Sequence, residues 1–263
     1  MKILRFSIRF FFIFLITSAL YGIIESPFKD SLFFSGEWWH IFSNYDSLSN
    51  NFFDKRMAYV DSSGYLHLLA IRERSTQGTR FYSAGIKSSR KKSFGIYRIE
   101  VIGRINNLLN TCFAPFLYDW DMGIYEIDIE FSKWGNPLHL GGNYSVHSWR
   151  PKHIRKGITF KPLSDYKIQD PVVSIHYIYL YPDSIKFKSS IPVYVLPESL
   201  QKTIKDQQEI IISKWKITDK NFIPQHRGLY PEVYLWWPVK KNTGPDTVEI
   251  IVKKFEYIPF KDN

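Results

Sequence analysis

The segment YEIDIEF, residues 125 to 131, alternates acidic and aliphatic side chains, and the interpretation of the whole chain starts from it. In a β-strand successive side chains point to opposite faces. Glu126, Asp128 and Glu130 would then line one face of a sheet, while Ile127 and Ile129 enter the core. Neighbouring carboxylates on one face repel each other and make one another harder to ionise, which costs stability. The row is therefore either a solvated sheet edge or a site whose chemistry needs several acids.

Aromatic and polar side chains surround this segment and favour a site over an edge. Trp120 precedes it, and Trp134, Asn143, His147 and Trp149 follow it. Indole rings stack on the apolar faces of sugars, and amide and imidazole groups form hydrogen bonds with hydroxyls. We therefore predict that these five residues bind substrate in a saccharide cleft. For His147, a purely structural role is an equal alternative.

Two carboxyl groups are the minimum equipment for hydrolysing a glycosidic bond. One protonates the leaving oxygen, and the other attacks the anomeric carbon or activates water. In retaining enzymes the two groups lie about 5 to 5.5 Å apart. At the usual strand rise the Cα atoms of residues 126 and 130 are about 13 Å apart, so both glutamate side chains must lean inward over Asp128. The middle acid would also keep the proton affinities of its neighbours apart, as one acid and one nucleophile require.

The remaining chain consists of short strand patterns separated by turn residues. YVDSSGYLHL carries a polar turn at residues 61–64 between two alternating segments, which is typical of a hairpin. Further strand patterns are FYSAGIKS, FGIYRIEVIG, VSIHYIYLY, EVYLWWPV and VEIIVKKFEYI. Their spacing predicts an all-β sandwich. Residues 198–209 alone have helical spacing, which predicts one short helix there.

The composition predicts one folded domain and argues against nucleic acid as a partner. The chain has 263 residues, a net charge of +10 and an isoelectric point near 9.4. Its basic residues are scattered, with no helix-turn-helix, zinc or RNA-binding signature, so we interpret the charge as a solvated surface. A polyanionic substrate is the alternative. The single cysteine, Cys112, excludes an intramolecular disulfide and is interpreted as core packing.

The N-terminus has the pattern of an export signal. Lys2, Arg5 and Arg9 precede the apolar run FFFIFLITSALYG, which predicts a signal peptide over residues 1–24 and a mature domain over residues 27–263. An uncleaved membrane anchor is the alternative. We expect a monomer that is secreted, periplasmic or on the cell surface, with a polysaccharide as its partner. Membrane contact is expected only if the leader is retained.

The order of the motifs adds a family resemblance. FSGEWWHI, VDSSGYLHLLA, FYSAGIKS, FGIYRIEVIG, YEIDIEF, YPDSIKF and EVYLWWP occur in this order. Together they resemble glycoside hydrolase family 16, of the concanavalin A-like lectin/glucanase superfamily. The resemblance implies a β-jelly-roll sandwich of two antiparallel sheets with a concave substrate cleft. It also implies a secreted endo-acting enzyme that cleaves β-glycans with retention.

The same resemblance implies a role for each acid. Glu126 matches the nucleophile, Glu130 the general acid/base, and Asp128 the residue that positions the nucleophile. The three acids follow without an extra residue, which is similar to the lichenase and xyloglucan-active branch, whereas laminarinase-like members usually carry a bulge here. Leu180 stands where the family often has a tryptophan, and this departure leaves the substrate class open.

Two alternative functions and a possible structural calcium ion complete these expectations. A non-catalytic glycan-binding protein could use the same fold, and a transglycosylase could use the same three acids with a sugar hydroxyl in place of water. We expect no cofactor and no catalytic metal. A structural calcium, as some family members hold on the convex face, would use oxygen ligands in the segments of Glu37 and Glu256. Neither residue lies in a recognisable loop motif, so absence of calcium is the preferred expectation.

Overall fold

The computed structural model describes residues 30–149, 151–162, 172–196, 198, 201, 208–225, 228–241 and 243–260. The predicted leader, residues 1–24, lies outside this part of the chain. So does most of the helix predicted over residues 198–209, and Glu209 begins a strand instead. Within the described residues, no helix has the length and apolar character needed to span a membrane.

The described chain is built from β-strands joined by turns and four short 3-10 helices. The strands are β1 (Ser31–Phe34), β2 (Glu37–Ile41), β3 (Asn44–Asp46), β4 (Asn51–Phe53), β5 (Ala58–Val60), β6 (Leu66–Ser75), β7 (Gly78–Ser88), β8 (Gly95–Gly103), β9 (Cys112–Tyr118), β10 (Tyr125–Phe131), β11 (Gly142–Ser148), β12 (Ile154–Phe160), β13 (Val172–Leu180), β14 (Ile185–Pro192), β15 (Glu209–Ile217), β16 (Tyr230–Trp236) and β17 (Thr247–Pro259). The 3-10 helices are η1 (Lys55–Met57), η2 (Ile105–Asn107), η3 (Val193–Val195) and η4 (Lys220–Phe222).

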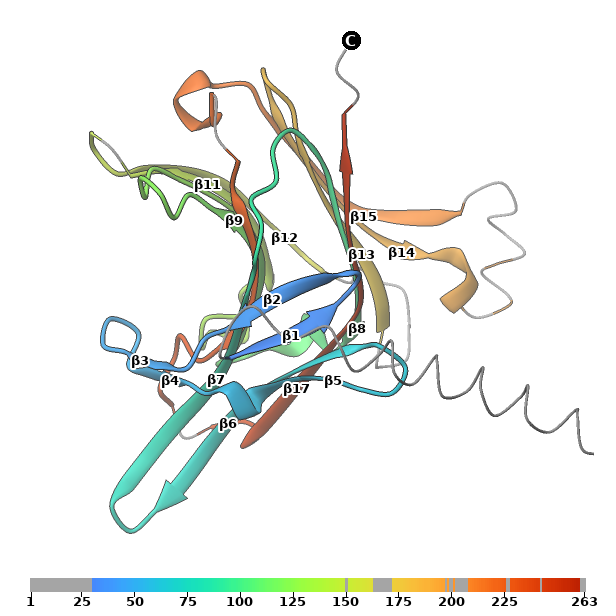
Figure 1. The fold of residues 1–263 in the computed structure, drawn as a ribbon. Helices are drawn as coiled ribbons and strands as arrows, with labels where there is room; N and C mark the ends of the chain where they lie inside the picture. Colours follow the sequence, from blue (N-terminus) through green and yellow to red (C-terminus); the bar gives the residue numbers. More distant parts are fainter. Residues whose placement is uncertain are drawn as a thin grey trace, which may run out of the picture.

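Most of these strands form two antiparallel layers, while β3 pairs with β4, β4 runs parallel to β7, and β5 pairs with β6. The first has the order β1-β2-β7-β16-β9-β10-β11-β12, and the second has the order β6-β17-β8-β13-β14-β15. Strand β7 joins the layers, because its first half pairs with β6 and its second half pairs with β16. Figure 1 shows β9 and β11 on one side of the molecule and β8 and β13 on the other. The prediction of an all-β jelly-roll sandwich is confirmed.

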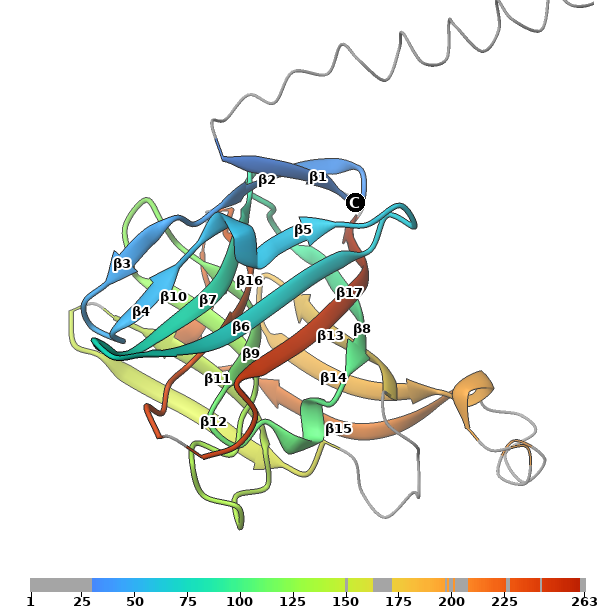
Figure 2. The same cartoon turned by 90° about the horizontal axis from the view of Figure 1, so that it is seen from below.

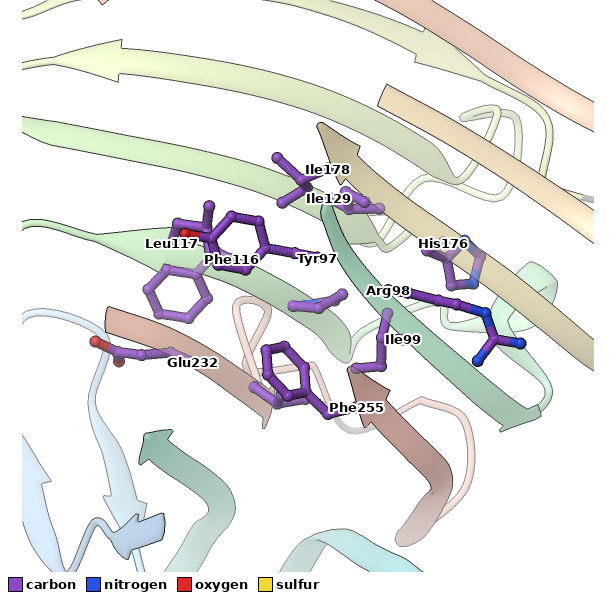
Figure 3. Close-up of a pocket in the computed structure, with 12 residues that line it drawn as sticks. Tyr97, Arg98, Ile99, Phe116, Leu117, Ile129, His176, Ile178, Glu232 and Phe255 are labelled. Carbon is purple, nitrogen blue, oxygen red and sulfur yellow. The ribbon is translucent and has the colours of Figure 1, made fainter. Parts of the chain in front are cut away.

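The core lies between the layers and holds β10 in place. Ile127, Ile129 and Phe131 are at most 1% exposed. Figure 3 shows Ile129 of β10 beside Ile178 of β13, where they line a core cavity of about 20 Å³. Burial of these apolar side chains stabilises the strand against the second layer. Because side chains alternate, the same contacts turn the three acids to the opposite face.

A polar network also crosses the core. The Tyr144 hydroxyl of β11 donates a hydrogen bond to Oγ of Ser189 on β14, at 2.7 Å. The two ring nitrogens of His176 on β13 lie 2.9 Å from Oγ of Ser189 and 2.9 Å from Oγ of Ser174. Burial lowers the pKa of His176 to about 3, so its ring is neutral in ordinary buffers. The network links the first layer to the second.

Three residues singled out in the sequence have structural environments that limit their chemistry. Cys112 is fully buried, and burial raises the pKa of its thiol, which fits packing and not a nucleophile. The carboxylate of Glu37 accepts a hydrogen bond from the ammonium of Lys92. That of Glu256 accepts one from Lys254 at 3.1 Å. Both carboxylates therefore have cationic partners, and the expectation about calcium stays a prediction.

Candidate active site

The geometry of β10 places the three acids in one uninterrupted row. The strand pairs residue for residue with β11, from Tyr125 opposite Ser148 to Phe131 opposite Gly142. Its other neighbour, β9, keeps the same register at both ends of the pairing. No bulge interrupts the strand, as the spacing of the motif predicted. Glu126, Asp128 and Glu130 therefore share the face of the first layer that points away from the core.

Two hollows meet at this row, and all three acids line both of them. The larger hollow, of about 570 Å³, is also lined by Trp134, His139, Asn143, His147, Trp149, Arg155 and Thr159. The smaller hollow, of about 190 Å³, is also lined by Asp46, Ser49, Phe53, Ala114, Phe116, Tyr234 and Trp236. Together they form a cleft that crosses β12, β11, β10, β9 and β16, with the acid row near its middle. A chain-like ligand in this cleft would cross the acids.

Residues on and just after β11 donate one hydrogen bond each to Glu126 and Asp128. The indole Nε1 of Trp149 donates to Glu126 Oε2 at 3.0 Å. The hydroxyl of Ser145 donates to Asp128 Oδ2 at 2.9 Å. Such donors favour the ionised form of the acid that accepts them. They partly offset the burial of these two side chains.

Glu130 has a different environment. Nδ2 of Asn143 donates to its Oε2 at 2.6 Å, and the guanidinium of Arg155 lies 3.8 Å from the same oxygen. Both partners come from the large hollow, from β11 and from the edge strand β12. The Glu130 side chain is itself 17% exposed, and it lines both hollows. Glu130 is thus held in place and remains open to a ligand.

Burial and mutual repulsion dominate the protonation of the other two acids. Burial, and after it the charge of Asp128, raises the pKa of Glu126 above its usual range. Burial, and after it the charge of Glu130, raises the pKa of Asp128. Carboxylates this close cannot all be ionised cheaply, so the pair of Glu126 and Asp128 retains a proton near neutral pH. A pair of acids that shares a proton can provide one anion and one neutral acid at the same time.

His147 lies beside the buried acid. Its Nε2 is 3.3 Å from Asp128 Oδ2 and 3.3 Å from Oγ of Ser145. Burial lowers its pKa, which keeps the ring neutral. His147 therefore both lines the large hollow and contacts Asp128, and its role towards a substrate stays a prediction.

Two of the predicted tryptophans form walls of the large hollow. Trp149 is 40% exposed, but one face of its indole is stacked on the ring of His153, with centroids 4.0 Å apart. Trp134 is 36% exposed and meets Trp236 edge to face, with centroids 6.4 Å apart. Its φ of 50° is unusual for a residue other than glycine. Both indoles therefore have fixed orientations at the cleft.

Trp120 is the one predicted substrate-binding residue that lines neither hollow. Its indole Nε1 donates to Glu232 of β16, and the ammonium of Lys87 lies 4.6 Å from its ring centroid. Glu232 is 2% exposed, and burial raises its pKa to about 7. Figure 3 shows its carboxyl directed away from the core cavity, and Trp120 reaches it from the loop after β9. Trp120 thus packs over a second buried acid.

Several residues of the site were not nominated from the sequence. Alternation along NYSVHS could have indicated Ser145, which lines neither hollow but donates to Asp128, since it lies between Asn143 and His147 on one face of β11. The same reasoning applied to EVYLWWP would have found Tyr234 and Trp236. No local pattern marks the lining residues that come from β3 and the turn after it, because only the folded chain brings them to the acids.

The solved structures similar to this chain are β-glucanases and related proteins. A β-glucanase of Bacillus licheniformis matches with a TM-score of 0.56 and 14% identity, over 89% of this chain and 94% of that one. The mixed-linkage glucan GH16 protein of Bacteroides ovatus, solved with a G4G4G3G product, matches with a TM-score of 0.59 and 12% identity, over 84% and 94%. A Mycobacterium tuberculosis protein described as a pseudo β-1,3-glucanase matches with a TM-score of 0.61 and 13% identity, over 90% and 94%.

At the level of sequence there is no such match. No protein-family profile and no curated protein is similar to the chain. The structural matches therefore show the fold, which is that of the family 16 glycoside hydrolases, and the expected resemblance is confirmed at that level.

Proposed function

We propose that this protein is a retaining, endo-acting β-glycan hydrolase. The observation that carries the proposal is the row of Glu126, Asp128 and Glu130, which lines both hollows at the middle of a cleft in a glucanase fold. A cleft that continues on both sides of the acids suits cleavage within a chain. The glucan product bound to the Bacteroides ovatus neighbour supports a polysaccharide as the ligand.

The chemistry proceeds by two displacements. Glu126 attacks the anomeric carbon while Glu130 gives its proton to the leaving sugar oxygen, which produces a glycosyl ester on Glu126. Glu130, now a base, then takes a proton from water, whose oxygen attacks the same carbon and releases Glu126. Asp128 can hold the proton that the pair shares, which leaves Glu126 as the anion. Trp149 and Ser145 orient these two carboxyls by the hydrogen bonds they donate.

Azide distinguishes the roles of the two glutamates. Glu126→Ala should lose roughly 10,000-fold of its polysaccharide hydrolysis, and azide should attack an aryl β-glycoside directly to give a glycosyl azide of inverted configuration. Glu130→Ala should still form the ester from that activated substrate, and azide should then give the retained product. Asp121→Asn is a matched control, since Asp121 lies in the loop before β10 and lines neither hollow. Identical azide products from both glutamate variants would contradict the assigned roles.

A second function, glycan binding without hydrolysis, is favoured by one specific observation. The Mycobacterium tuberculosis neighbour has this fold and is described as a pseudo β-1,3-glucanase. Under this alternative, wild-type protein would bind β-glucans in isothermal titration without releasing any product, and Glu126→Gln would bind equally well. Transglycosylation is the remaining outcome, recognised by products longer than the substrate.

The proposed substrate and the N-terminal pattern also suggest where the protein acts. We propose export to the periplasm, the cell surface or the medium, with residues 1–24 as a leader. A monomeric state and the absence of a cofactor remain predictions. Mass spectrometry of the exported protein would identify the cleavage site, and light scattering would give its oligomeric state.

A further inference from the structure

Two histidine rings form the outer part of the site. His147 belongs to β11, and its Nδ1 lies 3.0 Å from Nε2 of His153, which lies in the exposed segment just before β12. The ring planes are 5° apart. The His153 ring is also stacked on Trp149, with the planes 9° apart. These contacts fix the orientation of an exposed side chain that lines neither hollow.

A continuous chain of hydrogen bonds leads from the buried acid to this ring. Oγ of Ser145 is 2.9 Å from Asp128 Oδ2 and 3.3 Å from Nε2 of His147. His147 then continues to His153 through its other nitrogen. Asp128 is 4% exposed, whereas His153 is open to water. Every group in this chain can both donate and accept a proton.

The charges around His147 suit proton transfer. The charged groups that face it are Asp128, Glu126 and Glu130 from β10 and Arg155 from β12. Burial lowers its pKa in spite of the acids, so the ring is neutral, with one N–H and one free lone pair. Asp128, in contrast, holds a proton because burial raises its pKa, and it has little direct exposure to water.

We propose that His153 is the outer member of a proton relay that connects Asp128 to solvent through Ser145 and His147. For the transfer the Ser145 hydroxyl turns from Asp128 towards His147, so that Oγ accepts the proton of Asp128 while the hydroxyl proton passes to Nε2 of His147. The proton on Nδ1 of His147 moves to Nε2 of His153, and the proton on Nδ1 of His153 leaves to water. The net result is one proton moved from Asp128 to water, an Asp128 carboxylate and two neutral rings in their other tautomers.

The relay rests on the proposed function and has a place in its cycle. Once Glu126 has become a neutral ester, Asp128 no longer faces an anion on that side, so it can release its proton. When Glu126 is freed as an anion, a proton must return to the pair. Substrate would cover the row of acids in the cleft during these steps, whereas His153 lies outside both hollows. His153 is therefore a positioning and relay residue and not a group that touches substrate.

The first test needs no substrate. In protein labelled with ¹⁵N-histidine, proton NMR measures how fast the ring N–H of His147 exchanges with water, and the His147→Gln variant identifies its signal. In His153→Gln the amide retains a hydrogen bond to His147 but cannot pass a proton on, so exchange should be about 10-fold slower. The neighbouring exposed variant Lys152→Gln should exchange as the wild type does. Mere loosening of the loop would make exchange faster, so an unchanged or faster rate in His153→Gln overturns the relay.

The second test uses hydrolysis of soluble mixed-linkage β-glucan. His153→Ala should lower kcat about 10-fold, and added imidazole should restore it in proportion to its concentration. Lys152→Gln should keep the wild-type rate and should not respond to imidazole. Wild-type kcat in His153→Ala, or a loss that imidazole does not relieve, overturns the relay. If the wild type hydrolyses no glycan, the proposed function fails, and the exchange rate alone decides the relay.

Discussion

Ionisation of Glu126 and Asp128, the two buried acids of the site, should reduce the stability of the fold. Both have raised pKa values, so between the ordinary carboxyl pKa and the raised value the folded chain holds a proton that the unfolded chain has released. Stability therefore falls as pH rises through this window. Glu126→Gln removes the ionisable group, so its Tm should exceed that of the wild type at pH 8, and the difference should shrink towards pH 4.

Thermal unfolding followed by circular dichroism at the two pH values measures this effect. Glu73→Gln is the control, because Glu73 is an exposed acid on β6 away from the cleft. An equal Tm difference at pH 4 and pH 8 would show that the ionisation of Glu126 carries no such cost.

The indole of Trp149 provides a second prediction for a single residue. Trp149→Phe keeps an aromatic ring against His153 and removes only the donor to Glu126. A hydrogen bond to a charged group contributes about 1.5 kcal/mol, so its loss should move the acidic limb of the pH-rate profile up by about one unit. Steady-state hydrolysis between pH 4 and 9 measures the limb. A lower rate with an unshifted limb would mean that Trp149 only packs.

At the scale of elements, alternation predicted β10 and its two faces, but it did not predict the distant segments that lie against the cleft beside this strand. The pattern in YEIDIEF is local, and burial of Ile127 and Ile129 is sufficient to orient the acids. Asp46 and Ser49 reach the cleft only because β3 pairs with β4 and β4 runs beside β7. Figure 2 shows β3 and β4 on the same side of the molecule as β10. Such contacts between distant segments leave no periodic trace in the sequence.

His176 on β13 is buried in the hydrogen-bond network that joins β11, β13 and β14, and it should make the stability of the protein sensitive to acid. The pKa of His176 is about 3, below its ordinary value, so between about pH 6.5 and 3 the unfolded chain binds a proton that the folded chain does not. This contribution to stability is complete above pH 6.5 and is lost as pH falls. His176→Gln cannot gain that charge, so its stability should decline less steeply over this range.

Urea denaturation at pH 7 and pH 4 compares the two proteins. His67→Gln is the opposite comparison, because the His67 ring lies between the carboxylates of Asp61 and Glu249 and its pKa is raised, so the stability of this variant should decline more steeply than that of the wild type as pH falls. Equal slopes of stability against pH for wild type and His176→Gln would mean that the core network accommodates the charged ring.

At the scale of the whole molecule, the fold persists with little sequence identity. The glucanase neighbours share 12 to 14% identity with this chain and cover most of its length. A sandwich needs apolar residues at alternate positions and turns between strands, and many sequences satisfy this requirement. The cleft imposes stricter demands at only a few positions, such as the three acids of β10. This difference explains why strand patterns and one short motif predicted the architecture, whereas the substrate remained open.

The packing between the layers leads to the last prediction. Ile178 is 4% exposed on β13 and borders the core cavity beside Ile129. Ile178→Ala enlarges a cavity that already exists, and it should lower the free energy of unfolding by about 3 kcal/mol. Ile211→Ala removes the same atoms from a side chain that is 39% exposed, so its effect should stay within about 0.5 kcal/mol. Urea denaturation measures both values.

The acids lie on the face of β10 opposite to the core cavity. Folded Ile178→Ala protein should therefore bind or cleave β-glucan as the wild type does, when both are assayed about 20 °C below the unfolding temperature of the variant, where its native state is still populated. Loss of that activity in protein that is still folded would show that the core cavity and the cleft are coupled. A decrease in the free energy of unfolding no larger than that of Ile211→Ala would show that the two layers do not pack through Ile178.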